Sequence, residues 1–393
     1  MSKKFVPLSS IVIEKGLQTG PFGSQLKANE YTSEGIPIVM PKDIEAGRVS
    51  TKSIARTSVQ KASQLKKHFI KPGDILFPRR GDLGRIAVAS TDNEGWICGT
   101  GCLRARIKEN ISFSYIHQFL MLPQVLKWLE TNALGQTMLN LNTEIIGELP
   151  IYLPSLAEQK QIAFTLEQWD TAIEKTEALI DAKERQFGWL VTRLINKSGH
   201  KKKQLSDFIS EVSVRNRGNE IDRVLSVTNH SGFVLPEDQF ERRVASANVS
   251  NYKIVQQGQY AYNPSRINVG SIARLDDWDN GILSPMYTVF KLDQKMANSD
   301  YFLHWLSSGE AKQRIKKSAQ GSVRETVSFG DLGAIPICLP ELSVQQNIAN
   351  TLNTAQQEIT LLKKLADQYR TQKRGLMQKL LSGEWHIKNK EAA

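Results

Sequence analysis

The chain carries the same stretch of sequence twice, and this repeat limits its fold more than any other feature. LPSLAEQKQIAFTL begins at Leu153, and LPELSVQQNIANTL begins at Leu339, 186 positions later in a chain of 393 residues. At this offset, 16 of the 46 residues in 150–195 are identical to their counterparts, without a gap. The same offset pairs Arg80 with Arg266 further upstream. The sequence therefore predicts two copies of one structural unit, which together occupy the whole chain.

The best-preserved part of each copy has the apolar spacing of a long helix. Apolar residues recur at alternating intervals of three and four, which is typical of a helix with a narrow buried seam. Ser155 and Glu158 form the S-x-x-E pattern of a helix start just after Pro154, and Gly199 marks the stop. The second helix ends at Gly383. Each predicted helix has about 40 residues and is therefore about 60 Å long.

A seam this narrow on so long a helix favours a second helix as its partner. We expect the two helices to pair antiparallel as a coiled coil, with the two copies related by an approximate two-fold axis. The alternative is that each helix packs on its own domain without touching the other. The side chains predicted to form the helix-pair interface are Ile162, Leu166, Trp169, Ile173, Ile180, Phe187, Leu190, Leu194, Ile348, Leu352, Ile359, Leu362, Tyr369, Leu376 and Leu380.

The regions that precede the helices have a different pattern. Short β-type runs such as IPIVM (36–40) and MYTVFKL (286–292) are separated by Gly and Pro turns, with a helical stretch late in each copy. The pattern predicts an α+β protein in which two mixed α/β domains are separated by the long helices. The predicted segments are a first domain at 1–148, its helix at 149–199, a second domain at 200–334, its helix at 335–385 and a C-terminal tail at 386–393.

The charge balance indicates a nucleic-acid partner. Lys and Arg number 51 against 40 Asp and Glu, a net charge of +11, and the isoelectric point is about 9.4. The excess is spread along the chain, for example at Arg79 and Arg80, at Arg242 and Arg243, and in the basic link SGHKKKQ (198–204). Dispersed positive charge favours a broad surface that faces phosphates over a short basic tail.

Composition also excludes several classes of protein. No stretch approaches the roughly 18 apolar residues of a membrane span, and the N-terminus lacks the apolar core of a secretory signal. We therefore expect a cytoplasmic protein. Cys98, Cys102 and Cys338 are an odd number without C-x-x-C spacing, and the histidines are scattered, so we expect reduced thiols and no metal site.

The order of domain, long helix, domain, long helix resembles the DNA specificity subunit of type I restriction-modification systems. The resemblance covers essentially the whole chain and is carried by several motifs together. These are the two helix starts, GPFGSQLKANEY (20–31), GIPIVMPKDI (35–44), KPGDILFPRRGDLGRIAVA (71–89), YNPSRINVGSIARL (262–275), ILSPMYTVFKL (282–292) and GQTMLNLNTEIIGELPIYLP (135–154). The second copy of the last motif, at 321–340, keeps the glycines and loses the Asn-rich middle.

The resemblance implies a division of labour. Each mixed domain is then a target recognition domain that reads one part of a split, asymmetric DNA site, and the helices fix the gap between the two parts. The subunit is non-catalytic and binds two copies of a modification subunit, which methylates adenine at N6 with S-adenosylmethionine. In the full complex it also works with restriction subunits, motor-nucleases that use ATP and Mg. No cofactor is expected on this chain itself.

Base recognition in the major groove uses side chains with paired donors and acceptors, while Lys, Ser and Thr mostly contact phosphates. Such side chains are expected in polar, Gly-rich loops. In the first domain the DNA-binding candidates are Gln18, Thr19, Ser24, Gln25, Lys27, Arg79, Arg80 and Arg85. In the second domain they are Asn229, His230, Ser231, Tyr262, Asn263, Ser265, Arg266 and Asn268. The pairing of Arg80 with Arg266 favours a shared phosphate or framework role for these two.

An enzymatic function finds no support in the sequence. NPSR at Asn263 resembles the NPPY loop of amino-methyltransferases only in part, because the second Pro and the aromatic residue are absent. No Gly-rich S-adenosylmethionine loop precedes it, and no G-x-x-x-x-G-K-[ST], H-E-x-x-H or G-x-S-x-G pattern occurs. We expect no catalytic residues.

Two other functions stay open at the level of sequence. The chain could be the recognition subunit of a related methyltransferase-nuclease or phage-exclusion complex, built from the same domains. It could also be a structural adaptor without DNA, whose helices are the functional surface. DNA binding that depends strongly on salt separates both DNA-recognition functions from the adaptor.

Overall fold

The computed structural model of the chain has two compact units. The structure describes residues 5–45, 47–135, 139–195, 202–236, 248–319 and 326–387. The first unit comprises Met1–Thr176 and Leu365–Ala393, and the second comprises Glu177–Lys364. Gly199, Arg242, Arg243 and the first part of the basic link at 198–204 lie outside the described residues.

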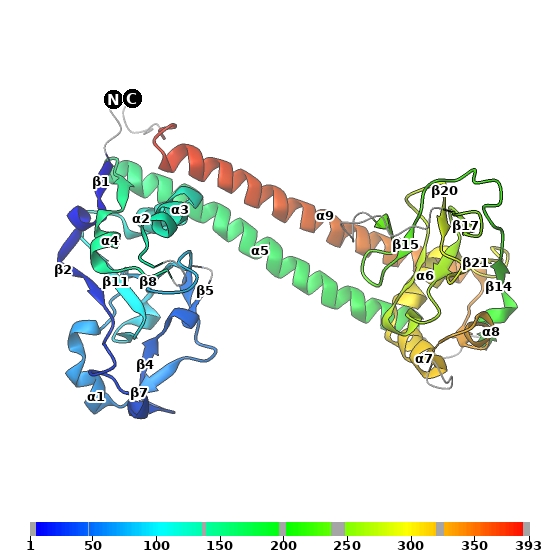
Figure 1. Ribbon diagram of the computed structural model, residues 1–393, viewed down its shortest axis with the longest axis horizontal. Coiled ribbons are helices and arrows are strands. Elements are labelled where there is room, and N and C mark those ends of the chain that lie inside the picture. The colour runs from blue at the N-terminus through cyan, green and yellow to red at the C-terminus, as the bar shows by residue number, and fades with distance from the viewer. Residues whose placement is uncertain are drawn as a thin grey trace. The chain divides into compact units, whose positions relative to one another are not determined.

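Both predicted long helices are present. They are α5 (Leu156–Ile195) and α9 (Leu342–Leu381), with 40 residues each (Figure 1). The Ser155 hydroxyl accepts a hydrogen bond from the Glu158 N–H at 3.3 Å, which is one half of the predicted capping box. Each unit contains part of α5 and part of α9. Each long helix is therefore continuous but contributes one part to the first unit and the other part to the second.

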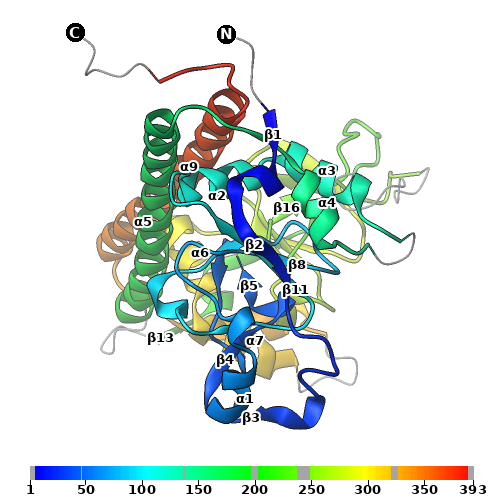
Figure 2. The ribbon, with the colours of Figure 1, turned by 90° about the vertical axis from the view of Figure 1, so that its left-hand side faces the viewer.

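Two four-stranded sheets form the body of the first unit. One has the strand order β2-β11-β8-β9 and the other β10-β4-β7-β3, and two ribbons, β1-β12 and β5-β6, complete the unit (Figure 2). The strands are β1 (Phe5–Pro7), β2 (Val12–Thr19), β3 (Tyr31–Thr32), β4 (Ile36–Val39), β5 (Ile44–Glu45), β6 (Arg48–Val49), β7 (Ala55–Thr57), β8 (Ile75–Pro78), β9 (Ala87–Val88), β10 (Ile97–Cys98), β11 (Cys102–Ile107) and β12 (Pro150–Tyr152). The helices are η1 (Leu8–Ile11), α1 (Val59–Gln64), η4 (Lys66–His68), α2 (Phe113–Leu120), α3 (Pro123–Asn132) and α4 (Thr143–Glu148), besides short 3-10 turns.

The second unit has one four-stranded sheet, β14-β21-β18-β19, and three ribbons, β13-β22, β15-β16 and β17-β20. Its strands are β13 (Lys202–Gln204), β14 (Ile209–Val212), β15 (Ser226–Val227), β16 (Phe233–Val234), β17 (Lys253–Gln256), β18 (Tyr260–Tyr262), β19 (Ile272–Arg274), β20 (Asn280–Leu283), β21 (Thr288–Leu292) and β22 (Pro336–Cys338). Its helices are η6 (Leu205–Asp207), η8 (Ile267–Val269), α6 (Ser299–Ser307), α7 (Gly309–Ala319) and α8 (Phe329–Gly333).

One sheet, one ribbon and the helices of the first unit recur in the second in the same order, whereas the four-stranded sheet β10-β4-β7-β3 has no four-stranded counterpart there. The antiparallel ribbon β1-β12 corresponds to β13-β22, and the sheet β2-β11-β8-β9 corresponds to β14-β21-β18-β19. The helix pair α2 and α3 corresponds to α6 and α7, and α4 corresponds to α8. The duplication that the sequence predicts is therefore present in the fold, and each copy mixes helices and strands as expected.

A buried glutamine joins each long helix to its own domain. The Gln159 side chain accepts a hydrogen bond from the Ser112 N–H at 3.0 Å and donates one to the Pro154 carbonyl at 2.8 Å. Gln345 repeats both bonds, each at 2.8 Å, with the backbone groups 186 positions further along. Both glutamines are almost completely buried. The two copies thus share this joint.

In the first unit, the start of α5 packs against the end of α9. The rings of Trp169 and Tyr369 meet edge to face with their centroids 5.6 Å apart, and Lys373 pairs with Asp170 at 2.5 Å. Ile162 lies in the same apolar cluster as the residues at the end of α9. The two helices therefore run antiparallel in this unit, as the seam predicts.

In the second unit, the end of α5 packs against the start of α9. Lys183 pairs with Glu358 at 2.8 Å, and Lys363 pairs with Glu184 at 2.7 Å. The last turns of α5 and the first turns of α9 also meet in one apolar cluster. The helices are antiparallel here too, so the fold has the pair of long antiparallel helices that the sequence predicts.

None of the predicted interface side chains is fully exposed, and they fall into two groups. Ile162, Leu166, Ile180, Ile348, Leu352, Ile359 and Leu380 are buried, and Trp169, Ile173, Phe187, Leu190, Leu194, Leu362, Tyr369 and Leu376 are half-buried. The residues near the helix ends, such as Leu166 and Leu352, also pack on the domain cores. The helices thus contact each other as well as their own domains, so the alternative in which they do not touch is wrong.

The helical stretch late in each domain is two helices instead of one. In the first unit it breaks between α2 and α3, where Pro123 occupies the first turn of α3 and Leu122 is extended. Proline favours this place because it lacks an N–H and restricts the residue before it. In the second unit the break falls at the extended Ser308.

In the described part of the chain, even α5 and α9 are too polar to be membrane spans.

Candidate nucleic-acid interface

Two loops of the first unit that the sequence predicts to bind DNA lie against each other. The loop after β2 contains Phe22, and the loop after β8 contains Arg79, whose Cζ atom lies 6.0 Å from the centroid of the Phe22 ring. The Arg79 Nε atom donates to Asn140 Oδ1 at 3.0 Å, and the Arg79 carbonyl accepts from the Leu141 N–H at 2.9 Å. The segment before α4 therefore holds the second loop in place.

A glycine pair lets the first loop approach its neighbour. A Cβ atom on Gly20 would lie 1.8 Å from the carbonyl oxygen of Gly99, and one on Gly99 would lie 2.6 Å from the Val39 carbonyl oxygen. These obstacles are backbone atoms, which cannot rotate away as a side chain can, so both positions require glycine. The Thr100 hydroxyl donates to the Pro21 carbonyl at 2.8 Å and closes the contact.

The exposed cations of this surface differ in their surroundings. Arg85 pairs with Asp82 at 3.0 Å, and both side chains are well exposed. Arg80 is exposed, and among the described residues it has no acidic partner. Ser24 and Lys27 are also exposed. Arg80 therefore presents an unpaired guanidinium group at this loop, a group that can bind an anion.

Two other candidates of the first unit, Gln25 and Gln18, make hydrogen bonds within the protein itself. Gln25 accepts a hydrogen bond from the Phe22 N–H at 3.3 Å and holds the turn. Gln18 is half-buried in β2 and accepts from Arg104 Nη2 at 2.9 Å, and Thr19 is half-buried beside it. Because its side-chain oxygen is occupied by a buried arginine, Gln18 belongs to the framework under the loops.

That framework contains a buried ionic cluster. Asp74 is 1% exposed and accepts two hydrogen bonds from Arg106, each at 2.7 Å. Arg104 is also buried, with Nε 3.8 Å from the Asp74 carboxylate, and it donates to the Phe69 carbonyl. Burial lowers the pKa of Arg104, and the Asp74 charge opposes that shift. One carboxylate thus balances two guanidinium groups inside the sheet that carries the loops.

His68, at the end of η4, is buried close to this cluster. Within the described residues neither ring nitrogen makes a hydrogen bond of ordinary geometry, although the Thr19 backbone lies near enough to favour the charged ring slightly. Burial, followed by the nearby charge of Lys67, lowers the pKa of His68 to about 4. The folded protein therefore holds this ring neutral.

We expect His68→Leu to reduce the acid sensitivity of the first unit. Between pH 6.5 and pH 4 the unfolded chain binds a proton at His68 that the folded chain does not, so stability falls as the pH falls through this window. In the parent, His68 lowers the free energy of unfolding at pH 4.5 by about 2 kcal/mol. The variant lacks this contribution. Thermal unfolding from pH 7 to pH 4.5 measures it, with exposed His230→Leu as the control. Some pH dependence persists because burial also lowers the pKa of His117.

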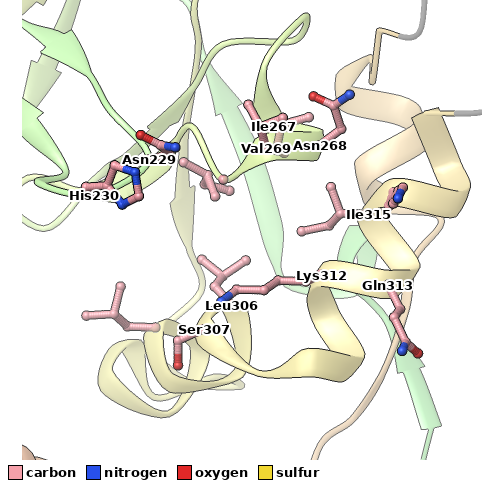
Figure 3. Close-up of a pocket in the computed structure, with 14 residues that line it drawn as sticks. Asn229, His230, Ile267, Asn268, Val269, Leu306, Ser307, Lys312, Gln313 and Ile315 are labelled. Atoms are coloured by element: carbon pink, nitrogen blue, oxygen red, sulfur yellow. The ribbon is translucent and has the colours of Figure 1, made fainter. Parts of the chain in front are cut away.

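In the second unit two predicted loops meet along one wall of a groove. Its cavity volume is about 540 Å³, and its walls include Asn229 and His230 from one loop and Asn268 from η8 (Figure 3). The facing wall is α7, with Lys312 and Lys316, and the floor is apolar. The amide and imidazole groups of the loops are exposed or half-buried. This groove brings together candidates that lie about 40 positions apart in the sequence.

Two predicted DNA contacts of the second unit are wrong in position. Tyr262 is completely buried and its hydroxyl donates to the Val327 carbonyl at 3.2 Å. Asn263 is buried, and its Oδ1 accepts from the Ser265 N–H at 3.0 Å. Both residues lie at the end of a core strand, so their side chains face inward and organise the turn. Ser231, Ser265 and Arg266 are exposed.

Sequence reasoning overlooked several residues of these surfaces. Phe22 and Asn140 lie in two of the sequence motifs, at 20–31 and 135–154. Their contacts with Arg79 join segments far apart in the chain, which local patterns do not predict. The lysines of α7 were visible as a basic helical stretch, QRIKK, and a comparison of charge between the two copies could have found them. Gly99 had no signal apart from its being a glycine.

Two buried cysteines lie in the first unit, outside any cluster of metal-ligating side chains that the described residues form. Across the described ranges, no group of three or more His, Cys, Asp or Glu side chains could hold a metal ion. Cys98 and Cys102 are buried free thiols. Burial raises the pKa of Cys98 to about 12 and that of Cys102 well above its ordinary value, so both are protonated at neutral pH.

Comparison with known proteins agrees with this arrangement. The family model of the type I restriction modification DNA specificity domain matches residues 20–182 and 246–368. A protein named as the MjaX specificity subunit of a type I restriction enzyme, from Methanocaldococcus jannaschii, is 24% identical over 383 residues, which cover 90% of this chain and 88% of that protein.

Two solved structures have a similar fold. The S subunit of a type I restriction-modification system from M. genitalium matches with a TM-score of 0.60 and 16% identity, covering 97% of this chain and 96% of that one. The HsdS subunit from Thermoanaerobacter tengcongensis matches with a TM-score of 0.50 and 15% identity, covering 97% of each chain. Because the family model matches both copies of the repeat, the chain belongs to the type I restriction modification DNA specificity family, whose role is DNA recognition and not catalysis.

Proposed function

We propose that each unit reads one part of a bipartite, asymmetric DNA site. The observation that supports this proposal is that the two copies keep the glutamine joint but differ in their polar loops. The joint made by Gln159 recurs at Gln345 with the same hydrogen bonds, whereas the surfaces around Arg79 and Asn268 have different side chains. Two copies that keep their attachment and change their polar loops are suited to reading unlike half-sites, since base choice depends on those side chains.

The long helices set the distance between the two half-sites in this proposal. Each helix is continuous over 40 residues, and each unit locks the pair with ionic and aromatic contacts, such as Trp169 on Tyr369 and Lys183 with Glu358. A packed pair of continuous helices resists bending, so the separation of the recognition loops is defined by helix length. Dimeric DNA-binding proteins follow the same geometric rule, with half-site spacing set by the element between the reading heads.

The partners in this proposal are double-stranded DNA, two modification subunits and, in the full complex, restriction subunits. The modification subunits supply S-adenosylmethionine-dependent methylation of adenine at N6, and the restriction subunits use ATP and Mg, so this chain needs no cofactor of its own. Exposed aromatic side chains on α5, Phe164 in the first unit and Trp189 in the second, support a protein partner on the helices. Recognition of cellular and invading DNA places the complex in the cytoplasm.

We expect an insertion of one heptad in both long helices to lengthen the spacer of the recognised site. The insertion follows Thr176 in α5 and Lys364 in α9, where the two units divide, so the contacts within each unit remain. Seven residues add about 10 Å, the rise of about three base pairs. Both half-sites stay the same because the recognition loops are untouched. Sequencing of methylated DNA from cells that carry the parent or the altered chain with its partner subunits measures the spacer.

A control insertion and two contrary results test the role of the helices and DNA recognition separately. Insertion into α5 alone breaks the register of the helix pair and should abolish methylation, which shows that both helices must change together. If the paired insertion altered the half-sites instead of the spacer, the role of the helices as a ruler would be wrong. If the parent chain with its partners bound no DNA in a salt-dependent way, DNA recognition itself would be refuted, and the adaptor function would gain support.

A further inference from the structure

The two copies of the repeat differ in the charge of one helix. In the second unit, α7 has the sequence GEAKQRIKKSA, with four basic residues and one acidic residue. Its counterpart in the first unit, α3, has the sequence PQVLKWLETN, with one basic and one acidic residue. The positive charge of α7 is thus a feature of one copy alone, and the fold does not require it.

Two of these lysines are available to a ligand. Arg314 pairs with Glu310 within α7, which accounts for the acidic residue of the helix. Lys312 and Lys316 are exposed, line the groove and have no acidic partner in the ranges that the structure describes. Two uncompensated ammonium groups one helical turn apart, on one wall of a groove, form a surface that attracts anions.

The side chains that face this turn differ between the two units. In the first unit, a Cβ atom on Gly84 would lie 3.1 Å from the Leu126 side chain of α3, so leucine packs closely over this turn. The residues 186 positions on are Gly270 and Lys312. The three atoms nearest to such a Cβ on Gly270 all belong to Asn229, at 3.5 to 3.9 Å, so no side chain of α7 lies as close to this glycine as Leu126 lies to Gly84. The exchange of leucine for lysine thus removes an apolar side chain from this wall and adds a positive charge to it.

We propose that this groove binds the sugar–phosphate backbone of one DNA strand, with Lys312 and Lys316 on phosphates. The inference rests on the proposed function and deepens it. The groove has the chemistry that a DNA backbone requires, because an apolar floor that includes Ile267 and Val269 suits deoxyribose and the lysines suit the phosphates. The loop residues Asn229 and Asn268 form its other wall, so a strand seated there brings base edges toward amide groups that can read them.

This assignment makes the two units unequal in how they hold DNA. Backbone contacts fix the position of the protein without distinguishing sequence, and the first unit has no equivalent lysines on α3. The second unit therefore has two backbone contacts that α3 does not supply in the first unit. A consequence is that loss of the two lysines weakens binding to any duplex by a similar factor.

The test measures the salt dependence of binding. The full-length chain with its modification subunit is titrated onto a DNA duplex of random sequence between about 50 and 200 mM salt. We expect Lys312→Gln with Lys316→Gln to weaken binding about tenfold and to reduce the slope of log K against log salt by about two. Lys295→Gln is the control, because Lys295 is exposed in the same unit and is not among the residues that line the groove. It should leave the slope unchanged.

A second pair of variants tests the floor of the groove without changing the lysines. Val269 is 61% exposed and lines the groove, whereas Val214 is 58% exposed and is not among the residues that line it. Val269→Glu places a carboxylate where the strand would run, and we expect it to weaken binding at least tenfold. Val214→Glu adds the same charge elsewhere in the unit, and we expect less than a threefold change.

Each outcome decides the inference. If the parent binds with a steep salt slope and the double lysine variant has the same slope and affinity, the groove is not a backbone site, although DNA recognition stands. A change of preferred sequence in the second half-site, with an unchanged slope, would also overturn it, since the lysines would then read bases. If the parent shows no salt-dependent binding to DNA, the proposed function and this inference fail together.

Discussion

Asp74→Asn is expected to lower the free energy of unfolding of the first unit by about 3–5 kcal/mol. The substitution keeps the size of the side chain but removes the one carboxylate that faces Arg104 and Arg106. Both guanidinium groups then lie in the sheet without a counter-charge, and Arg104 is buried. An uncompensated buried charge costs far more than the loss of one hydrogen bond. In thermal unfolding, the transition of the first unit should fall by roughly 10 °C.

The matched control for this experiment is Asp82→Asn in the same unit. Asp82 also pairs with an arginine, Arg85, but both side chains are exposed, so we expect a change below about 1 kcal/mol. The second unit supplies an internal reference, because its unfolding should not shift in either variant. Equal effects of the two substitutions would contradict the view that burial gives the Asp74 cluster its weight.

The second large effect is expected at the duplicated glutamine joint. Gln345→Leu removes the acceptor of the Asn298 N–H and the donors to the Met296 and Pro340 carbonyls. These backbone groups are buried or half-buried, and leucine cannot satisfy them, so the second unit should lose about 3 kcal/mol of stability. Gln159→Leu should have a somewhat smaller effect on the first unit, since that side chain makes two such bonds.

Hydrogen exchange of backbone amides measures this prediction for each unit separately. Gln345→Leu should increase exchange in α6 and at the start of α9, whereas Gln159→Leu should do so in α2 and at the start of α5. Gln357→Leu, at an exposed position of α9, is the control and should leave exchange unchanged. If either variant increased exchange equally in both units, the view that each glutamine stabilises only its own unit would be wrong.

The repeat predicted much of the fold because it combines two signals. The spacing of Ile162, Leu166 and Trp169 is local, and a helical period can be followed along the chain without knowing its partner. The identity of residues such as Gln159 and Gln345 then shows that the same element occurs twice. Together they indicated two mixed domains and a pair of long antiparallel helices, and the structure has both. The split of the late helical stretch at Pro123 was visible in the sequence but was not used.

The interface residues were predicted less well, because their role depends on burial. Tyr262 and Asn263 have the side chains of DNA-binding residues, yet both are buried. Whether a polar side chain in a Gly-rich segment is exposed depends on where the preceding strand ends. Here β18 still pairs with β21 at Tyr262, so this residue belongs to the sheet and not to the loop. Arg80 and Arg266 are exposed as expected, because they lie beyond the strand ends.

The sequence by itself determined that this protein is a duplicated α+β chain with two 40-residue helices and a net positive charge, since periodicity, identity and charge are properties of the chain alone. Only the tertiary structure decided which loops meet. The contact of Arg79 with Phe22, the passage of Gly20 beside Gly99 and the open groove at Lys312 join segments that are distant in sequence. Their positions follow from the packing of strands and helices, which no local pattern encodes.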